Sequence, residues 1–379
     1  MHHHAVPATP PADTTTPERR TLCLLGLPID VTSMDDAVVR VREAVRLRRP
    51  MFLSTPNLNF LVGSQSDSGF RQSVIDSDLS LADGMPLVWM SRLMGVPLPE
   101  RVTGSDLFER LVNDPMPPDQ PPLRVYFFGG PPGAAAAAAK GLDERKGSMV
   151  CVGHASPGFG SVEDMSSPEV IDAINASGAD FLIIALGAAK GQAWIQRNRG
   201  QINAPVISHL GAVVNFTAGT VKRAPGWVGK VGMEWLWRIK EEPALWRRYV
   251  KDAMTLGKLL GGAVLPQALG RNVPQSGRWA AVTLEHASDG PRLVIRGALE
   301  GSVPPTVQAS LHACAQSQGR HVTLDLTKLR HAGPEFQGQL LLLHRELCAQ
   351  GRHISVLGSS RVKRHLRLNR VELDAGAAA

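Results

Sequence analysis

Short apolar runs, each followed by a turn and then by a segment with helical spacing, recur along the first two thirds of the chain. We expect strands at 21–27, 51–55, 79–83, 124–130, 181–187 and 204–211. In 33–47, apolar residues recur every three or four positions, and Ser33 is expected to be the N-cap. Strands that alternate with helices predict a parallel sheet covered on both faces. Ligands bind such sheets at the carboxyl ends of the strands.

A second α/β pattern follows a segment at 261–274, which contains several Gly and Pro residues and is predicted to be a linker. We expect strands at 279–286, 292–297, 322–325 and 354–357, helices at 303–318 and 336–350, and a final basic helix. These elements make up a small α/β domain of ordinary size. Residues 1–20, rich in Pro, Thr and Ala, are expected to be a disordered leader and not a signal peptide.

The formal charge of +7 favours an anionic partner. Between Lys222 and Lys258 the chain has nine Lys or Arg residues against four Asp or Glu, together with four of its seven tryptophans. Cations interleaved with tryptophan are typical of a helix that lies in a membrane interface. No apolar run reaches the roughly 18 residues that span a bilayer. We therefore expect residues 221–260 to dock on an anionic membrane surface, and we expect no nucleic-acid partner.

The sequence indicates neither a disulfide framework nor a metal site. Its four cysteines are scattered without CxxC spacing, which favours a reducing cytoplasm. Asp76 and Asp78 form a carboxylate pair, but no further ligand set accompanies them. His154 and His209 are isolated and are interpreted as structural. We expect no metal and no cofactor.

Polar residues follow two of the expected strands, and each has two interpretations. Thr55 and Asn57 could hydrogen-bond a sugar or an acceptor hydroxyl, or the Pro-Asn pair could make a turn and cap the next helix. Asp83, beside Gly84, could act as a general base on an acceptor hydroxyl, or it could be a helix N-cap.

Two further segments suit phosphate groups. Residues 101–106 combine Arg101 with a hydroxyl and a glycine, which suits a diphosphate, or they cap a helix at 106–112. The turn that contains Gly129 and Gly130 leads into an alanine-rich helix, whose amino end could face a phosphate. Structural glycines in a tight turn are the alternative. A nucleotide-dependent oxidoreductase is disfavoured, because no glycine fingerprint with a downstream ribose-binding acid is present.

Taken together, these motifs resemble the WecG/TagA/CpsF glycosyltransferase family over 22–252. The segments that carry the resemblance are CLLGLPID, TPNLNFL, LADGMPLV, RLMGVPLPERVTGSDL, FFGGPPG, IIALGAAKGQAWI and AGTVKRAPGWVGKVGMEWLWRIKEEPALWRRY. The resemblance implies a Rossmann-like parallel-sheet domain at 21–220, with a basic amphipathic C-terminal appendage at 221–260. It also implies metal-independent, inverting transfer of N-acetylmannosamine or a related sugar from its UDP form. The implied acceptor is an undecaprenyl-diphosphate-linked saccharide at the inner face of the plasma membrane.

The resemblance assigns roles to individual residues. Asp83 becomes the general base, Thr55 and Asn57 lie beside the acceptor or donor sugar, and Arg101 helps to hold the donor diphosphate. Further substrate-binding candidates are Gly129, Gly130, Lys190, Gln192 and Asn215, and the appendage arginines expected to bind phosphate are Arg223, Arg238, Arg247 and Arg248. Arginine suits that task because its planar fork grips phosphate oxygens in pairs.

Three departures from the family pattern bear on activity. Gly191 stands where the family usually has a glutamine, so either Gln192 substitutes from the next position or the donor differs. Asn215 replaces the usual aspartate, which leaves Asp83 as the sole clear acid or base. The EPALWRRY segment is one residue shorter than usual, which affects the register of the last two appendage arginines. The alternative function is therefore a catalytically silent protein that binds a lipid-linked glycan or recruits a partner.

Residues 275–373 resemble a STAS domain, the fold of anti-sigma-factor antagonists. The resemblance lies chiefly in GRHVTLDLTKLRHAGPEFQGQLLLLHRELCAQGRHISVLG. In phosphorylated members an Asp-Ser pair follows the LDL strand, but Gly333 and Pro334 occupy the matching positions here. Because neither residue has a hydroxyl, we expect no phosphorylation switch there. A scaffold or partner-binding role is predicted, with a possible protein partner.

Overall fold

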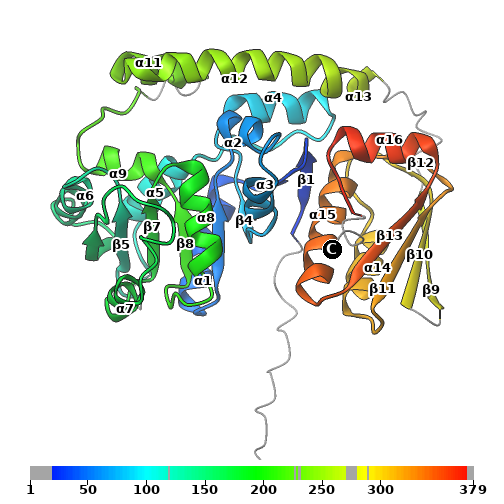
Figure 1. Ribbon diagram of the computed structural model, residues 1–379, viewed down its shortest axis with the longest axis horizontal. Helices are drawn as coiled ribbons and strands as arrows, with labels where there is room; N and C mark the ends of the chain where they lie inside the picture. The colour runs from blue at the N-terminus through cyan, green and yellow to red at the C-terminus, as the bar shows by residue number, and fades with distance from the viewer. Residues whose placement is uncertain are drawn as a thin grey trace, which may run out of the picture.

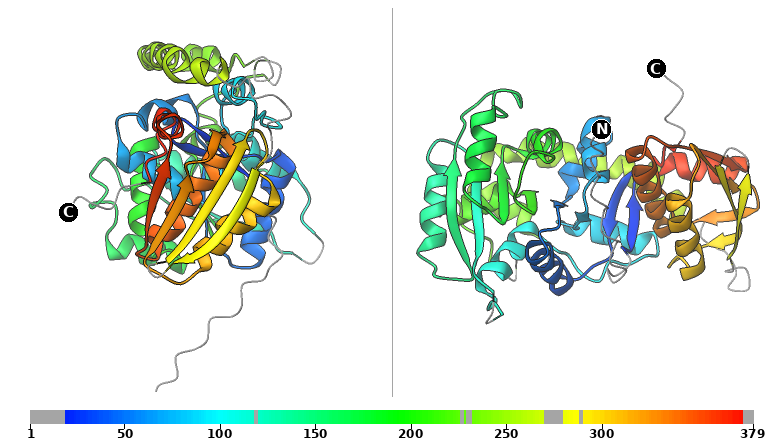
Figure 2. Two further views of the ribbon diagram at one scale, coloured as in Figure 1. Left: turned by 90° about the vertical axis from the view of Figure 1, so that its right-hand side faces the viewer. Right: turned by 90° about the horizontal axis from the view of Figure 1, so that it is seen from below.

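The computed structural model describes residues 19–117, 120–225, 228, 232–269, 280–287 and 290–373. The expected leader lies outside the described residues except for its last two positions. Two α/β parts lie side by side, and a row of helices runs along one side of the molecule (Figure 1). The views in Figure 2 show the same arrangement from the C-terminal end and from below.

The first part is built on a six-stranded sheet in which all neighbouring strands are parallel. In spatial order the strands are β4 (Leu79–Ser80), β3 (Met51–Ser54), β8 (Val206–His209), β7 (Phe181–Ala185), β5 (Leu123–Gly129) and β6 (Met149–Ala155). The predicted parallel sheet is therefore confirmed. The sequence analysis missed β6, an edge strand that is only partly buried and in which Gly153 and His154 follow a short apolar run at 149–152.

Helices cover both faces of this sheet. One face packs against α1 (Met34–Arg46), α5 (Gly104–Asn113), α6 (Ala134–Asp143) and α9 (Gly211–Thr217), and the other against α7 (Pro168–Ala176) and α8 (Ala188–Asn198). Ser33 caps α1 as predicted, in a capping box with Asp36. On the second face the fully buried Trp194 ring lies 4.8 Å from the ring of Phe128. This layered arrangement fits a Rossmann-like fold.

The expected strand at 21–27 is not part of this sheet, so that prediction was wrong. The segment forms a separate antiparallel hairpin of β1 (Thr21–Leu24) and β2 (Leu27–Asp30). Leu25 and Gly26 both have positive φ, 50° and 93°, which a two-residue hairpin turn requires. The hairpin packs with α2 (Leu58–Gly63), α3 (Ser68–Ile75) and α4 (Met85–Leu93) around a core of its own.

The C-terminal part is a five-stranded mixed sheet with three helices. Its elements are β9 (Ala280–Ala287), β10 (Gly290–Leu299), α14 (Pro305–Gln316), β11 (His321–Leu326), β12 (Leu329–Ala332), α15 (Pro334–Ala349), β13 (His353–Gly358) and α16 (Ser360–Leu368). Only β9 runs antiparallel to its neighbour. The expected elements are present, and the short strand β12 was missed. The identity of the C-terminal part as a STAS-like domain stays a prediction.

The helices that join the two parts are nearly continuous. They are α11 (Glu234–Glu241), the short η1 (Pro243–Leu245), α12 (Trp246–Leu259), the π-helical η2 (Leu260–Val264) and α13 (Leu265–Leu269). The linker expected at 261–274 is therefore helical as far as Leu269, and 270–274 lies outside the described residues. Ala263 and Val264 are buried in the hairpin core, which holds this segment in place. Among the described residues, no helix has the length and apolarity needed to cross a bilayer.

Candidate active site

Thr55, Asn57 and Asp83 come together at the carboxyl ends of β3 and β4, around the start of α5. The Gly104 N–H donates to Asp83 Oδ2 at 3.2 Å. A Cβ at Gly104 would lie 3.1 Å from Thr55 Cγ2, and one at Gly84 would lie 3.6 Å from Asn57 Cβ. The topology of the sheet thus gathers three residues that the sequence places 28 positions apart at most.

The structure distinguishes between some of the alternative interpretations. Asn57 does cap α2, because its side chain accepts from the Phe60 N–H at 3.3 Å. Asp83 does not cap α4, whose N-cap is Gly84 without a side-chain hydrogen bond. Thr103 caps α5, which begins at Gly104 and not at the expected residue 106. Asp83 therefore does not cap the helix that follows it, and instead it accepts from the N–H of Gly104, the first residue of α5.

The surroundings of Asp83 change the pKa of its carboxyl group. Burial raises the pKa of Asp83 to about 6, against a lowering by the Gly104 N–H. The nearby Glu234 carboxylate raises this pKa further, while the charges of Arg238 and Arg101 lower it. A carboxylate with a pKa near neutrality can take up a proton during a reaction, as a general base must.

Helix α11 brings charged residues to this carboxylate. Arg101 Nη1 lies 2.7 Å from Glu234 Oε2, so the sheet edge and α11 are joined by an ion pair. Glu234 and Arg238 both act electrostatically on Asp83. Sequence reasoning missed Glu234 because its partner is 133 residues away in the chain.

Arg223 and Arg238 lie together against the ring of Phe216. Their guanidinium carbons lie 5.6 and 5.5 Å from the centroid of the Phe216 ring. Arg223 also pairs with Asp106 in the first turn of α5. Asn215 and Arg238 both line a small cavity of about 80 Å³ between α9 and α11. These three predicted residues therefore lie together.

Other predicted residues lie elsewhere or have structural partners. Lys190 Nζ donates to the Gly160 carbonyl at 2.7 Å. Gly129 and Gly130 have φ of 103° and 82°, and a Cβ at Gly129 would come within 2.8 Å of the Ala185 carbonyl. The glycines are thus needed for the turn itself.

Arg247 and Arg248 project from α12 and are exposed. Each guanidinium lies against its neighbour in sequence, over Trp246 at 5.7 Å and over Tyr249 at 5.2 Å. No hydrogen bond or ion pair ties these two arginines to Asp83 in the part of the chain that is described. Their place on the row of helices suits a surface role.

Gln192 of α8 and His209 at the end of β8 both have buried polar atoms. Gln192 Nε2 donates to Ser54 Oγ at 3.2 Å. Gln192 Oε1 and His209 Nε2 have no hydrogen-bond partner among the described residues. Burial lowers the pKa of His209 to about 4, which keeps the imidazole neutral at physiological pH. A polar residue at the end of an apolar strand was the only sequence signal for His209.

Gly191 leaves the space that the His209 ring fills. A Cβ at residue 191 would lie 2.3 Å from His209 Cδ2. We therefore expect Gly191→Ala to lower the free energy of unfolding by about 1–3 kcal/mol, as overpacking does, although alanine favours a helix. Adding His209→Ala should restore part of this loss in a chemical denaturation experiment. An unchanged unfolding free energy for the single variant would contradict the packing of this pair.

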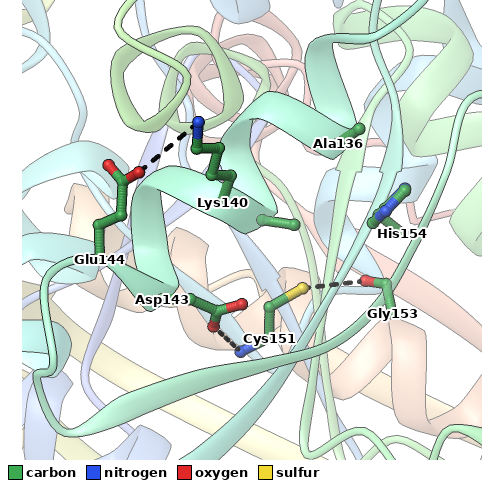
Figure 3. Close-up of a pocket in the computed structure, with 8 residues that line it drawn as sticks. Ala136, Lys140, Asp143, Glu144, Cys151, Gly153 and His154 are labelled. Carbon is green, nitrogen blue, oxygen red and sulfur yellow. Dashed lines mark hydrogen bonds and ion pairs between the residues drawn. The ribbon is translucent and has the colours of Figure 1, made fainter.

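A wide surface depression lies at the opposite edge of the sheet from β4, between α6 and β6 (Figure 3). Its polar groups bond one another, since Asp143 accepts from the Cys151 N–H at 3.1 Å and Lys140 lies 3.8 Å from Glu144. His154 also lines it. It contains none of the predicted site residues. Across the described residues, no group of three or more His, Cys, Asp or Glu side chains is placed to hold a metal ion.

Comparisons with known proteins agree on one family. The sequence model of the glycosyl transferase WecG/TagA/CpsF family matches residues 22–268. The chain is similar to an N-acetylglucosaminyldiphosphoundecaprenol N-acetyl-beta-D-mannosaminyltransferase of Bacillus spizizenii, with 32% identity over 50% of this chain and 74% of the relative. Relatives of the same name in Bacillus subtilis and Staphylococcus aureus are 25% and 23% identical, over 54% and 59% of this chain and 78% and 85% of theirs. The matched region covers the sheet, the hairpin and the joining helices.

Proposed function

The chain belongs to the WecG/TagA/CpsF family of glycosyltransferases, and we propose that it moves a sugar from a UDP-sugar to a hydroxyl of an undecaprenyl-diphosphate-linked saccharide. The relatives are named for an N-acetylmannosaminyl group and for an acceptor that carries N-acetylglucosamine on diphosphoundecaprenol. We therefore propose N-acetylmannosamine or a related sugar as the transferred group, for bacterial polysaccharide synthesis. The observation that carries the proposal is Asp83, held among cations at the carboxyl edge of the sheet.

In the proposed reaction, Asp83 removes the proton from the acceptor hydroxyl. The hydroxyl oxygen attacks the anomeric carbon of the donor, and the bond from that carbon to the diphosphate oxygen breaks, so that UDP leaves with the electron pair. A single displacement of this kind inverts the anomeric centre. Thr55 and Asn57 are proposed to orient the sugars beside Asp83.

Arginines are proposed to take the place of a metal ion in this reaction. Arg101, Arg223 and Arg238 lie around the site and can neutralise the charge on the departing diphosphate. A diphosphate on Arg101 would compete with the Glu234 carboxylate that now lies 2.7 Å away. Phosphate binding would therefore loosen the contact between the sheet edge and α11.

The row of helices α11–α13 is proposed to lie on the cytoplasmic face of the plasma membrane. It exposes large apolar side chains, namely Met233, Trp235, Leu236, Trp246, Val250, Met254, Leu265 and Leu269. Exposed Arg247 and Arg248 lie among them. Apolar side chains flanked by cations are what an interfacial helix needs.

Release of UDP tests the proposed activity directly. Purified protein is incubated with a panel of UDP-sugars, with and without a short-chain polyprenyl-diphosphate saccharide. We expect UDP to appear with one donor and only when the acceptor is present. If no donor in the panel released UDP, the alternative would be favoured, namely a protein that binds lipid-linked glycans without transferring sugar.

A scaffold role is proposed for the C-terminal part. Gly333 and Pro334, where a phosphorylated domain of the STAS type would carry its Asp-Ser pair, are buried at the start of α15. The next residue, Glu335, pairs with Arg20 at 2.9 Å, just before the hairpin. Because this segment is buried and pairs with another part of the chain, it suits a scaffold better than a phosphorylation switch.

A further inference from the structure

Helix α16 of the C-terminal part has a strongly basic outer face. Residues 359–370 contain five Lys or Arg residues and no Asp or Glu. Val362 and Leu366 are buried against the C-terminal core. The exposed cations are Arg361, Lys363, Arg364 and Arg367. Within the described residues none of these four has an ion-pair partner, so the charge is available to an external anion.

This helix is fixed to the end of the row of joining helices. Gln267 of α13 and Asn369, directly after α16, exchange two side-chain hydrogen bonds of 3.1 and 2.6 Å. His365 of α16 bonds the same Gln267 oxygen at 3.1 Å. Both amide side chains are buried. Buried paired amides specify one relative placement, because a shift would leave polar groups unsatisfied.

The placement puts α16 on the side of the molecule where α11, α12 and α13 run (Figure 1). In the end-on view of Figure 2, α16 lies below the row of joining helices, at the upper end of the C-terminal part and away from the lower ends of its strands. Between α12 and α16, Leu265 and Leu269 of α13 are 45% and 78% exposed. From α12 through α13 to α16, the molecule thus exposes cations, then leucines, then cations again.

We propose that α16 is a second membrane contact, which binds the phosphate headgroups of anionic lipids while α13 meets the acyl boundary. This inference rests on the proposed docking of α11–α13 and extends it to the C-terminal part. Exposed leucines between the two basic groups favour a lipid surface over a nucleic acid, whose backbone offers no apolar layer. Two basic contacts on one rigid body reinforce each other and fix its orientation. The carboxyl edge that carries Asp83 would then be held at a constant distance from a lipid-linked acceptor.

The test measures binding of the full chain to sedimented vesicles of phosphatidylcholine, with and without phosphatidylglycerol. The variant carries Arg361→Gln, Arg364→Gln and Arg367→Gln. The three changes should weaken binding by about a hundredfold, because each cation near an anionic surface contributes about 1 kcal/mol. The matched control carries Arg46→Gln, Lys146→Gln and Arg320→Gln, three exposed cations that precede the amino ends of β3, β6 and β11. We expect the control to bind within about twofold of the wild type.

The outcomes separate this inference from the proposed function. A wild type that fails to bind anionic vesicles, or whose binding is insensitive to salt, would overturn the membrane docking of α11–α13 as well. If the wild type binds and the α16 variant binds equally, only the contact by α16 is overturned. A variant with Lys at the same three positions should retain binding and the wild-type melting temperature. Preferential binding of double-stranded DNA by the wild type at equal salt would also contradict the choice of lipid.

Discussion

Replacing Asp83 with asparagine is expected to lower kcat by about a hundredfold to ten-thousandfold, the usual cost of losing a general base. The donor KM should stay close to that of the wild type, because the new side chain keeps the shape of the old one. Its amide oxygen can still accept from the Gly104 N–H, which now lies 3.2 Å from Asp83 Oδ2. Both constants come from acceptor-dependent release of UDP. An Asp83→Asn variant as fast as the wild type would remove Asp83 from the mechanism.

The pH dependence gives a second measure of the same carboxylate. A base must be ionised, so kcat/KM of the wild type should rise with pH through the Asp83 pKa of about 6 and then level off. Glu234→Gln should move this rise to lower pH, because the Glu234 carboxylate raises the pKa of Asp83. The Asp83→Asn variant should show no rise at that pH. A rise that persists in the variant would assign the titration to another group.

Stability should respond to the same group with a defined sign. The folded-state pKa of Asp83 is above the ordinary value of 3.8, so the protonated carboxyl stabilises the fold and the charged one opposes it. This contribution is present below about pH 4 and is lost as the pH rises through about 6. At pH 8 the Asp83→Asn variant should therefore melt at a higher temperature than the wild type. The difference should shrink as the pH falls toward 4.

The sequence predicts the central sheet well because its strands are buried on both faces. β7 is apolar throughout, and β5 is apolar from Val125 to Phe128, and turns bound both runs, which is the pattern of a strand buried on both faces. The same reasoning predicted one strand where the hairpin at 21–30 lies, because the tight turn at Leu25 and Gly26 leaves the apolar run almost unbroken. The edge strand β6 was missed because its apolar run at 149–152 is short and is followed by Gly153 and His154.

The sequence could predict some residues of the candidate site and not others. Thr55, Asn57 and Asp83 could be grouped in advance, because carboxyl ends of neighbouring parallel strands meet at one edge. Glu234 could not, since its approach to Arg101 depends on how α11 folds back over the sheet. His209 also needed the structure, because only the packing against Gly191 shows where its ring lies. Periodicity predicts elements, whereas contacts between distant elements depend on packing.

The contact between α15 and the hairpin ties the two α/β parts together. Glu335 is fully buried and accepts from Arg20 and from the Val303 N–H. Cys23 of β1 packs within the apolar core of the C-terminal part. At the closest point, a Cβ at Gly338 would lie 2.1 Å from the Thr21 carbonyl oxygen and 2.6 Å from its carbon. Only glycine allows α15 to approach β1 this closely.

We expect Gly338→Ala to lower the free energy of unfolding by about 1–3 kcal/mol, although the same change favours a helix by up to about 1 kcal/mol elsewhere. The atoms that the new methyl group meets belong to the backbone of β1, so no side-chain rotation can relieve the clash. Gly257→Ala in α12 is the matched control, because nothing lies within 4 Å of its Cβ position. This control should stabilise the protein slightly.

The number of unfolding transitions shows whether the contact between α15 and β1 joins the two parts into one cooperative unit. If the two parts share one cooperative unit through β1, Gly338→Ala should lower a single transition, and the tryptophan signal of the first part should move with it. If the C-terminal part unfolds independently, only a separate transition should shift, and the stability of the sheet that carries Asp83 should stay unchanged. The buried Glu335, the shared Cys23 and the close approach at Gly338 all favour the single unit. In that case removal of the C-terminal part would expose the apolar side chains of β1 to water, and activity would be lost through unfolding and not through loss of a partner.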